Sequence, residues 1–277
     1  MSSRTTAFVL GGGGVLGATQ VGMLRALASA GITPDLVLGT SIGALNGAFA
    51  AADPSEAGAD RLGEVWHEVV RKGLFTQRPL RQVAQIPRNR THVLSHAPLQ
   101  LLVERYLPVT TFEELTVPFQ CVAAEIEDCA ATWFDSGPLA PPVLASCSVP
   151  GLFAAVQIGG RHYLDGGLVH SIPVGRALSL GASEIYVLQV GRVEQQLKPP
   201  TTPWAVAAVA FEISRRHRFV DEIASVPDDV ALHILPSGVS SSPTVSIAQA
   251  RGQRMRERMD AAYAASIDYL EGVERWR

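Results

Sequence analysis

A lone serine stands between two glycines near the start of the chain, in the run Gly39-Thr40-Ser41-Ile42-Gly43. Apolar residues precede this run and small apolar residues follow it, so the pattern predicts a strand, a tight turn and a helix. Such a turn holds a serine hydroxyl clear of the backbone, and the glycines prevent side-chain clashes. The pattern therefore indicates a candidate nucleophile, although a serine that only caps an ordinary helix fits the same five residues.

A second glycine-rich turn comes earlier, directly after another apolar run. Gly12, Gly14 and Gly17 have the spacing of the dinucleotide-binding fingerprint, which also lies between a strand and a helix. That fingerprint expects an acidic residue at the end of the second strand. Asp35 precedes the predicted second strand and does not follow it. Dinucleotide binding is therefore one interpretation of this turn.

The other interpretation of the same turn is an oxyanion hole. Consecutive glycines such as Gly12, Gly13 and Gly14 present bare backbone N–H groups that can stabilise a developing negative charge. We favour this interpretation because both glycine-rich turns would then act on one substrate atom beside Ser41. A turn with a purely structural role is the third alternative.

Asp165 is the carboxylate that the pattern singles out as a base. A serine nucleophile needs a base, most often a histidine that an aspartate orients. None of the seven histidines stands in a convincing turn, whereas Asp165 directly follows a predicted strand and precedes Gly166 and Gly167. Asp-Gly-Gly is also common in simple turns, so this motif alone leaves both readings open.

Composition narrows the class of protein. The chain has 277 residues, a net charge of −3 and no basic tail, so we expect no nucleic-acid partner. Cys121, Cys129 and Cys147 cannot all pair within the chain and match no zinc spacing, so we predict reduced thiols, no metal and a cytoplasmic protein. No apolar run approaches the ~18 residues of a membrane span, so any contact with a membrane should be peripheral.

Strands and helices alternate over the first 52 residues, which predicts an α/β fold with a parallel sheet. Apolar residues at helical spacing then predict a helical insertion at about residues 60–108. A basic stretch inside it leaves open whether residues 71–95 form a lid or a surface loop. Residues 191–277 are expected to form a mainly helical extension on the same domain, with a long last helix that begins at Pro243 after Ser242 as N-cap.

Taken in order, the two glycine-rich turns and the Asp-Gly-Gly turn resemble those of the bacterial patatin-like phospholipases. Residues 20–24, Gln-Val-Gly-Met-Leu, and residues 145–153 add to the likeness, which spans a predicted catalytic core of residues 6–190. The resemblance implies a three-layer α/β/α fold with a mostly parallel central sheet.

The resemblance also implies a serine acyl hydrolase that cleaves fatty-acyl esters of lipids without a cofactor or a metal. In such a Ser–Asp dyad Ser41 is the nucleophile and Asp165 the base. The oxyanion donors would be Gly12, Gly13 and Gly14. The glycines that support the motifs would be Gly17, Gly39, Gly43, Gly166 and Gly167.

Two positions depart from the family pattern. Leu16 stands where the family often has Arg or Lys, and His170-Ser171 precedes Pro173 where Asn is common. Leu16 keeps open a catalytically weak, lipid-binding patatin relative, and the spacing of Gly12, Gly14 and Gly17 keeps open a dinucleotide-binding protein. The sequence does not indicate the oligomeric state.

Overall fold

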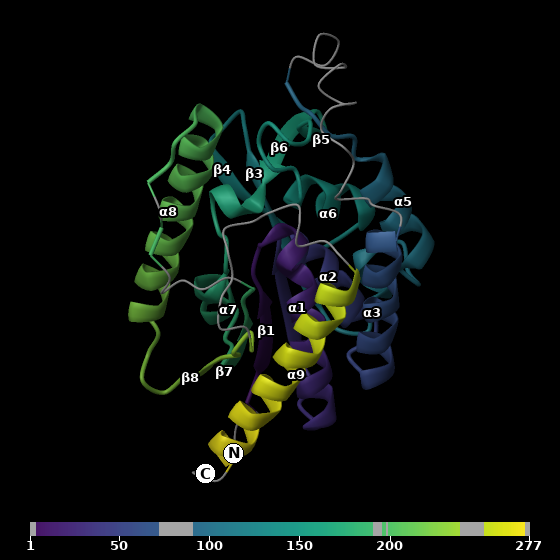
Figure 1. Cartoon of the computed structure of the whole chain (residues 1–277), viewed down its shortest axis with the longest axis vertical. Helices are drawn as coiled ribbons and strands as arrows, with labels where there is room; N and C mark the ends of the chain where they lie inside the picture. Colours follow the sequence, from purple (N-terminus) through teal and green to yellow (C-terminus); the bar gives the residue numbers. More distant parts are fainter. Residues whose placement is uncertain (1–3, 72–90, 191–195, 198, 239–251, 275–277) are drawn as a thin grey trace.

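The computed structural model describes residues 4–71, 91–190, 196–197, 199–238 and 252–274 (Figure 1). Within these ranges eight strands form one sheet: β1 Thr6–Leu10, β2 Leu36–Thr40, β3 Phe119–Glu125, β4 Ala130–Phe134, β5 Val156–Ile158, β6 Arg161–Asp165, β7 Glu184–Leu188 and β8 Ala231–Ile234. The described helices are α1 Ala18–Ser29, α2 Ile42–Ala52, α3 Glu56–Arg71, α5 Ala97–Tyr106, α6 Ala140–Ser146, α7 Val174–Ser179, α8 Pro203–Ala224 and α9 Gly252–Glu274, with short 3₁₀ turns η1 Gly14–Gly17, η3 Phe112–Glu114 and η4 Gly166–Leu168.

The sheet has the strand order β5-β6-β3-β2-β1-β7-β8, and β4 pairs with β3. The strands from β3 through β2, β1 and β7 to β8 are parallel, whereas β4, β5 and β6 join by antiparallel pairing. Parallel strands end at the same edge, so the turns after β1 and β2 lie side by side. The predicted α/β class and mostly parallel sheet are confirmed.

Helices cover both faces of the sheet (Figure 1). Along β1 the side chains alternate, with Phe8 and Leu10 in the core under α1, α2, α3 and α9, and Ala7 and Val9 in the core under α7 and α8. Small residues of α2, such as Ala44 and Ala48, are fully buried on the first of these faces. The three-layer α/β/α arrangement follows from this alternation of apolar side chains.

The register of β3 brings the ends of β2 and β6 together. Thr40 of β2 pairs with Val122 of β3, and Asp165 of β6 pairs with the next residue, Ala123. Because β4 occupies the other edge of β3, β2 and β6 meet end to end on one edge. Ser41, which follows Thr40, is therefore set beside Asp165 although 124 residues separate them in sequence.

The later segments join the same sheet. β8 pairs with β7, and α9, yellow in Figure 1, packs along α1. The long last helix is described from Gly252, so its predicted start at Pro243 and the cap Ser242 lie outside the described residues. Most of residues 71–95, the segment considered as a lid, also lie outside them.

Local differences from the predicted elements follow from the tight turns. The glycine-rich turn after β1 does not lead directly into a helix, because residues 14–17 form a 3₁₀ turn and the α-helix begins at Ala18. Gly14 has a φ of +56°, which glycine adopts without strain, so the turn closes before the helix starts.

Candidate active site

Ser41 occupies a strained turn at the amino end of α2. Its φ is 56° and its ψ is −128°, in a region that serine rarely adopts. Gly43 permits the turn, since a Cβ on it would lie 2.2 Å from the carbonyl oxygen of Leu10. The turn thus needs glycine where α2 crosses the end of β1, and it directs the serine side chain away from the helix.

The Ser41 hydroxyl donates a hydrogen bond to the Asp165 carboxylate, with Oγ and Oδ2 2.6 Å apart. The other carboxylate oxygen, Oδ1, accepts a hydrogen bond of 2.7 Å from the amide of Gly167. Ser41 is 7% exposed and Asp165 is 1% exposed. The structure therefore brings both predicted dyad residues together, with the carboxylate fixed from its far side.

Burial raises the pKa of Asp165 to about 6, against the opposing effect of the hydrogen bonds from Ser41 and Gly167. Phe211 of α8 lies next to Gly167, the residue whose amide holds the carboxylate. Among the described residues no cationic side chain pairs with Asp165. The carboxylate is thus more basic than a free aspartate and still ionised at neutral pH.

The glycine loop after β1 faces Ser41. A Cβ on Gly12 would lie 3.1 Å from Ser41 Cβ, so the loop backbone touches the nucleophile. The Gly12 amide donates to the carbonyl of Ser171 at 3.0 Å and is not free to bind an oxyanion. In the part of the chain that the structure describes, no acceptor is found for the amides of Gly13 and Gly14. Of the three glycines predicted as oxyanion donors, Gly13 and Gly14 therefore have amides that are available.

Three buried polar side chains brace both ends of this loop. Gln20 Nε2 donates to the carbonyl oxygen of Gly11 at 2.9 Å, and Asn46 Nδ2 donates to that of Gly17 at 2.9 Å. Asn46 Nδ2 also donates to Gln20 Oε1 at 2.8 Å, and Trp66 Nε1 donates to Asn46 Oδ1 at 3.0 Å. We call Gln20, Asn46 and Trp66 the bracing network; it links α1, α2 and α3 to the loop and fixes its course.

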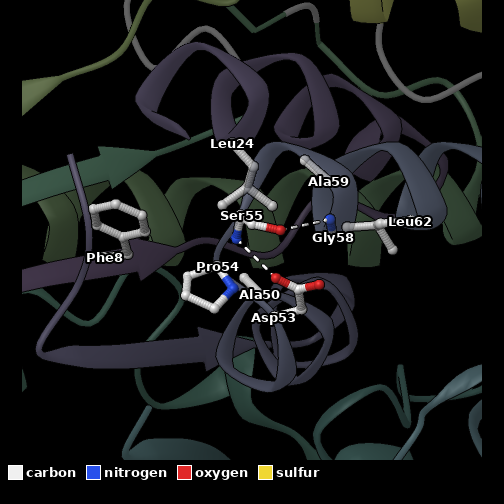
Figure 2. Close-up of a pocket in the computed structure, with 9 residues that line it drawn as sticks. All are labelled: Phe8, Leu24, Ala50, Asp53, Pro54, Ser55, Gly58, Ala59 and Leu62. Carbon is white, nitrogen blue, oxygen red and sulfur yellow. Dashed lines mark hydrogen bonds between the residues drawn. The ribbon is translucent and has the colours of Figure 1, made fainter. Parts of the chain in front are cut away.

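A pocket elsewhere in the molecule does not belong to this site (Figure 2). It lies at the carboxyl end of α2, whereas Ser41 precedes the amino end of that helix. Its polar groups are occupied, because Asp53 accepts from the Ser55 amide and Ser55 Oγ accepts from the Gly58 amide. These contacts cap the start of α3 and leave little for a ligand to bind.

Residues 8–178, more than half of the chain, match the sequence family described as patatin-like phospholipase. The chain belongs to the patatin-like phospholipase family. The predicted family membership is therefore confirmed.

Relatives of this patatin-like chain are larger proteins. Lysophospholipase nte1 of Emericella nidulans is 28% identical over 279 residues, which are 98% of this chain and 16% of the relative. Patatin-like phospholipase domain-containing protein 7 of Mus musculus is 29% identical over 193 residues, which are 69% of this chain and 14% of the relative. This chain thus spans about a sixth of the length of these relatives.

A solved structure shares the fold. VipD from Legionella pneumophila matches with a TM-score of 0.51 and 14% sequence identity, over 97% of this chain and 67% of that chain. At this level of identity the likeness extends to the fold alone.

Three residues beside the dyad have positioning roles that the sequence analysis did not predict. Ser146 Oγ accepts from the amide of Ser41 at 2.9 Å, and the Cys147 thiol lies 2.9 Å from the Ser41 carbonyl oxygen, to which it donates. The Ser148 carbonyl accepts from the amide of Asp165 at 2.9 Å. Burial, and next the nearby carboxylate, keep the pKa of Cys147 well above its usual value. These three residues at the end of α6 hold both dyad backbones.

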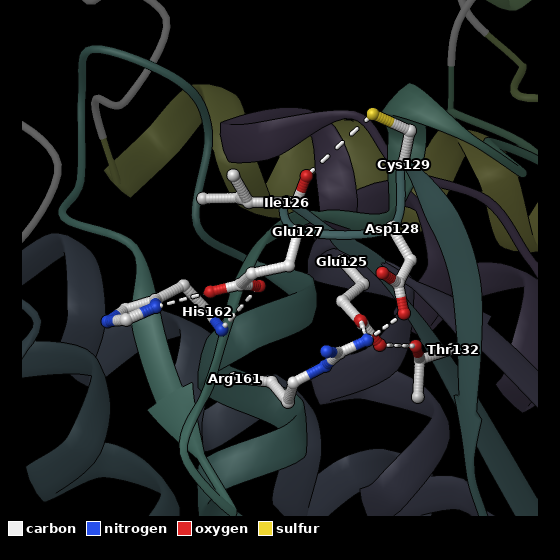
Figure 3. Close-up of polar contacts among 8 residues, drawn as sticks. All are labelled: Glu125, Ile126, Glu127, Asp128, Cys129, Thr132, Arg161 and His162. Carbon is white, nitrogen blue, oxygen red and sulfur yellow. Dashed lines mark hydrogen bonds and ion pairs between the residues drawn. The ribbon is translucent and has the colours of Figure 1, made fainter.

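Side chains at the start of β6 hold its other end (Figure 3). Arg161 pairs with Glu125 and Asp128 around the β3–β4 turn. His162 Nδ1 lies 2.6 Å from Glu127 Oε1 on the same turn. Because Asp165 closes the same short strand, these contacts steady the strand that carries it. Within the described residues no group of His, Cys, Asp and Glu has the arrangement of a metal site.

Proposed function

We propose that this chain is a serine acyl hydrolase that cleaves fatty-acyl esters of lipids. The single observation that carries the proposal is the 2.6 Å hydrogen bond between Ser41 Oγ and Asp165 Oδ2 at a strained turn. Family membership supports a lipid ester as the substrate class. The names of the lysophospholipase and phospholipase relatives support the same class.

In the proposed reaction Asp165 accepts the Ser41 proton while Ser41 Oγ attacks the ester carbonyl. The Gly13 and Gly14 amides stabilise the oxyanion that forms, as preorganised donors do in acyl transfer. Collapse of this intermediate returns the proton from Asp165 to the leaving alcohol and leaves an acyl group on Ser41. A water molecule, deprotonated by Asp165, then releases the fatty acid.

The geometry favours Asp165 as the base because histidines are engaged elsewhere. Among the described residues, which include all seven histidines, none is hydrogen-bonded to Ser41 or Asp165. His170 pairs with Glu222 on α8, and His96 Nε2 lies 2.9 Å from Ser148 Oγ. In the described part of the chain the histidine of a Ser-His-Asp triad is therefore not found beside the nucleophile.

The geometry disfavours the dinucleotide-binding alternative, because its candidate acidic residue, Asp35, lies far from the glycine loop. Asp35 lies before β2, at the opposite edge of the sheet from the glycine loop, where its carboxylate accepts from the amide of Thr6 at 2.8 Å. Ser41 occupies the end of β2, where the fingerprint requires a carboxylate for the ribose.

Peripheral contact with a membrane is a further part of the proposal. None of the helices in the described ranges is long and apolar enough to span a bilayer. α8, whose Phe211 borders the dyad, exposes Val206, Ile213 and Val220 along its outer side. These side chains would allow the helix to rest on a lipid surface.

A fluorophosphonate probe tests the hydrolase directly. We expect the probe to label Ser41, and Ser41→Ala to lose both labelling and p-nitrophenyl butyrate turnover, by about 10³-fold or more. Thermal unfolding of the variant should match the wild type. Wild-type turnover by Ser41→Ala would refute the assignment, and absence of any turnover would favour the lipid-binding alternative.

A further inference from the structure

One buried hydroxyl beside the dyad has no hydrogen-bond partner. Ser171, in the loop between η4 and α7, is 4% exposed, and its Oγ is without a partner among the described residues. Buried polar side chains are nearly always paired, so an unpaired one calls for a reason. The backbone of Ser171 has an evident structural role, but its hydroxyl has none in this structure.

The loop that carries Ser171 is pinned across the edge of the sheet at the nucleophile. The carbonyl of His170 accepts from Thr40 Oγ1 at 2.7 Å, at the end of β2. The carbonyl of Ser171 accepts from the amide of Gly12 at 3.0 Å. A Cβ on Gly12 would lie 3.1 Å from Ser41 Cβ and 3.8 Å from Ser171 Oγ, so both side chains border the same point of the glycine loop.

The loop has one donor fewer than its three consecutive glycines could offer. The Ser171 carbonyl occupies the Gly12 amide, so of the three glycines predicted as oxyanion donors Gly13 and Gly14 are left. Leu16, at the end of the same loop, is buried and supplies no positive charge. A hydroxyl rotates freely about its Cβ–Oγ bond and can turn its proton toward a charge that appears during the reaction.

We propose that the Ser171 hydroxyl is a further donor to the oxyanion, a catalytic role that rests on the proposed acyl hydrolase function. Its proton stays on Oγ throughout, and only a hydrogen bond forms as the carbonyl oxygen gains charge. The bond is made in the tetrahedral state and not in the resting enzyme, so the unpaired hydroxyl is the ground-state form of the donor. The carbonyl of Ser171 thus occupies the Gly12 amide, and its hydroxyl supplies another donor in place of that amide.

The test compares Ser171→Ala with Ser171→Thr, which keeps the hydroxyl, on a short p-nitrophenyl ester. We expect Ser171→Ala to lower kcat about tenfold or more, with KM changed less than about twofold, because the bond exists only in the transition state. Its affinity for an alkylboronic acid, which forms a tetrahedral anion on Ser41, should fall by a similar factor. Ser171→Thr should keep most of the wild-type kcat.

Ser266→Ala is the matched control, since Ser266 is a fully buried serine on α9 whose hydroxyl contacts the carbonyl of Pro236. It should leave kcat unchanged. The melting temperature should not fall in Ser171→Ala, where no hydrogen bond is lost.

Wild-type kcat and boronate affinity in Ser171→Ala, or equal losses in the Ala and Thr variants, would overturn the role of the hydroxyl while Ser41-dependent turnover stands. A wild-type protein without Ser41-dependent turnover would overturn the proposed function and the role of Ser171 together.

Discussion

Two groups of buried polar residues lie on either side of the glycine loop, and they differ in how fully they are paired. In the bracing network each side-chain nitrogen and oxygen of Gln20 and Asn46 has a partner. In the catalytic group Ser41 has a strained backbone, and among the described residues Asp165 has no cationic partner and the Ser171 hydroxyl has no hydrogen-bond partner. A paired network fixes the position of the loop, whereas a buried charge without a cation, a strained backbone and an unpaired hydroxyl cost stability and are kept for the substrate.

The difference predicts opposite responses to substitution. Removing a member of the catalytic group should reduce turnover and leave the folded state as stable as before or more so. Removing a member of the bracing network should lower the free energy of unfolding. Its effect on the turnover of the molecules that remain folded should be smaller.

The largest effect is expected for Asp165→Asn. The amide keeps the size of the side chain and can still accept from Gly167 and contact Ser41, but it cannot take a proton. We expect kcat to fall by about 10²–10⁴-fold, the usual contribution of a general base. Thermal unfolding at pH 7 should be unchanged or occur at a higher temperature, because a buried charge disappears.

Asp228→Asn is a matched control on an exposed carboxylate far from the site in sequence, and it should change neither quantity. A clear loss of stability in Asp165→Asn would contradict the comparison, because Asp165 would then belong with the structural group.

The next effect is expected for Asn46→Ala. This change removes the hydrogen bonds of Asn46 to the Gly17 carbonyl, the Gln20 amide oxygen and the Trp66 indole N–H, and it opens a small cavity. We expect a loss of roughly 2–4 kcal/mol in the free energy of unfolding, measured by urea titration.

Trp66→Phe tests the same network more gently, because it removes one donor and leaves the Gln20 and Asn46 bonds to the loop intact. Its loss should be smaller, about 1 kcal/mol. Equal stability of Asn46→Ala and wild type would show that the network does not brace the loop.

The sequence and the structure agree best where a local pattern sets the geometry. Gly39, Ser41 and Gly43 predict the strained turn because only glycine allows the contact with β1. The pairing of Ser41 with Asp165 came from the family resemblance, since it depends on the register of β3, to which no short motif points. The partner of a long-range contact cannot be deduced from local periodicity.

The bracing network and the role of the Ser171 hydroxyl were not predicted from the sequence, for a related reason. Asn46 is the one polar side chain in an otherwise small and apolar helix, a signal that could have marked it as a buried hydrogen-bonding residue. Gln20 and Trp66 carry no such mark. Gly12 was predicted as an oxyanion donor, yet its amide is bonded to Ser171, a contact between segments 159 residues apart in the numbering that only the folded chain reveals.

The last prediction concerns pH. Since Asp165 must be ionised to accept a proton and its pKa is about 6, kcat/KM should rise about tenfold per pH unit below 6 and level off above it.

The free energy of unfolding should change in the opposite direction and fall as pH rises. The folded-state pKa lies above the unfolded value of about 3.9, so the folded state holds the proton more tightly. Between about pH 4 and pH 6 the protein should therefore lose stability as pH rises, by at most roughly 3 kcal/mol from this group.

Asp165→Asn should remove this component of the pH dependence, whereas Asn46→Ala should lower stability by the same amount at every pH, because the bracing network contains no titratable group. Urea titrations of the three proteins at pH 4.5, 6 and 7.5 measure both behaviours. A kcat/KM that is already level at pH 4.5 would contradict the raised pKa, and Asp165 would then resemble an ordinary exposed aspartate in spite of its burial.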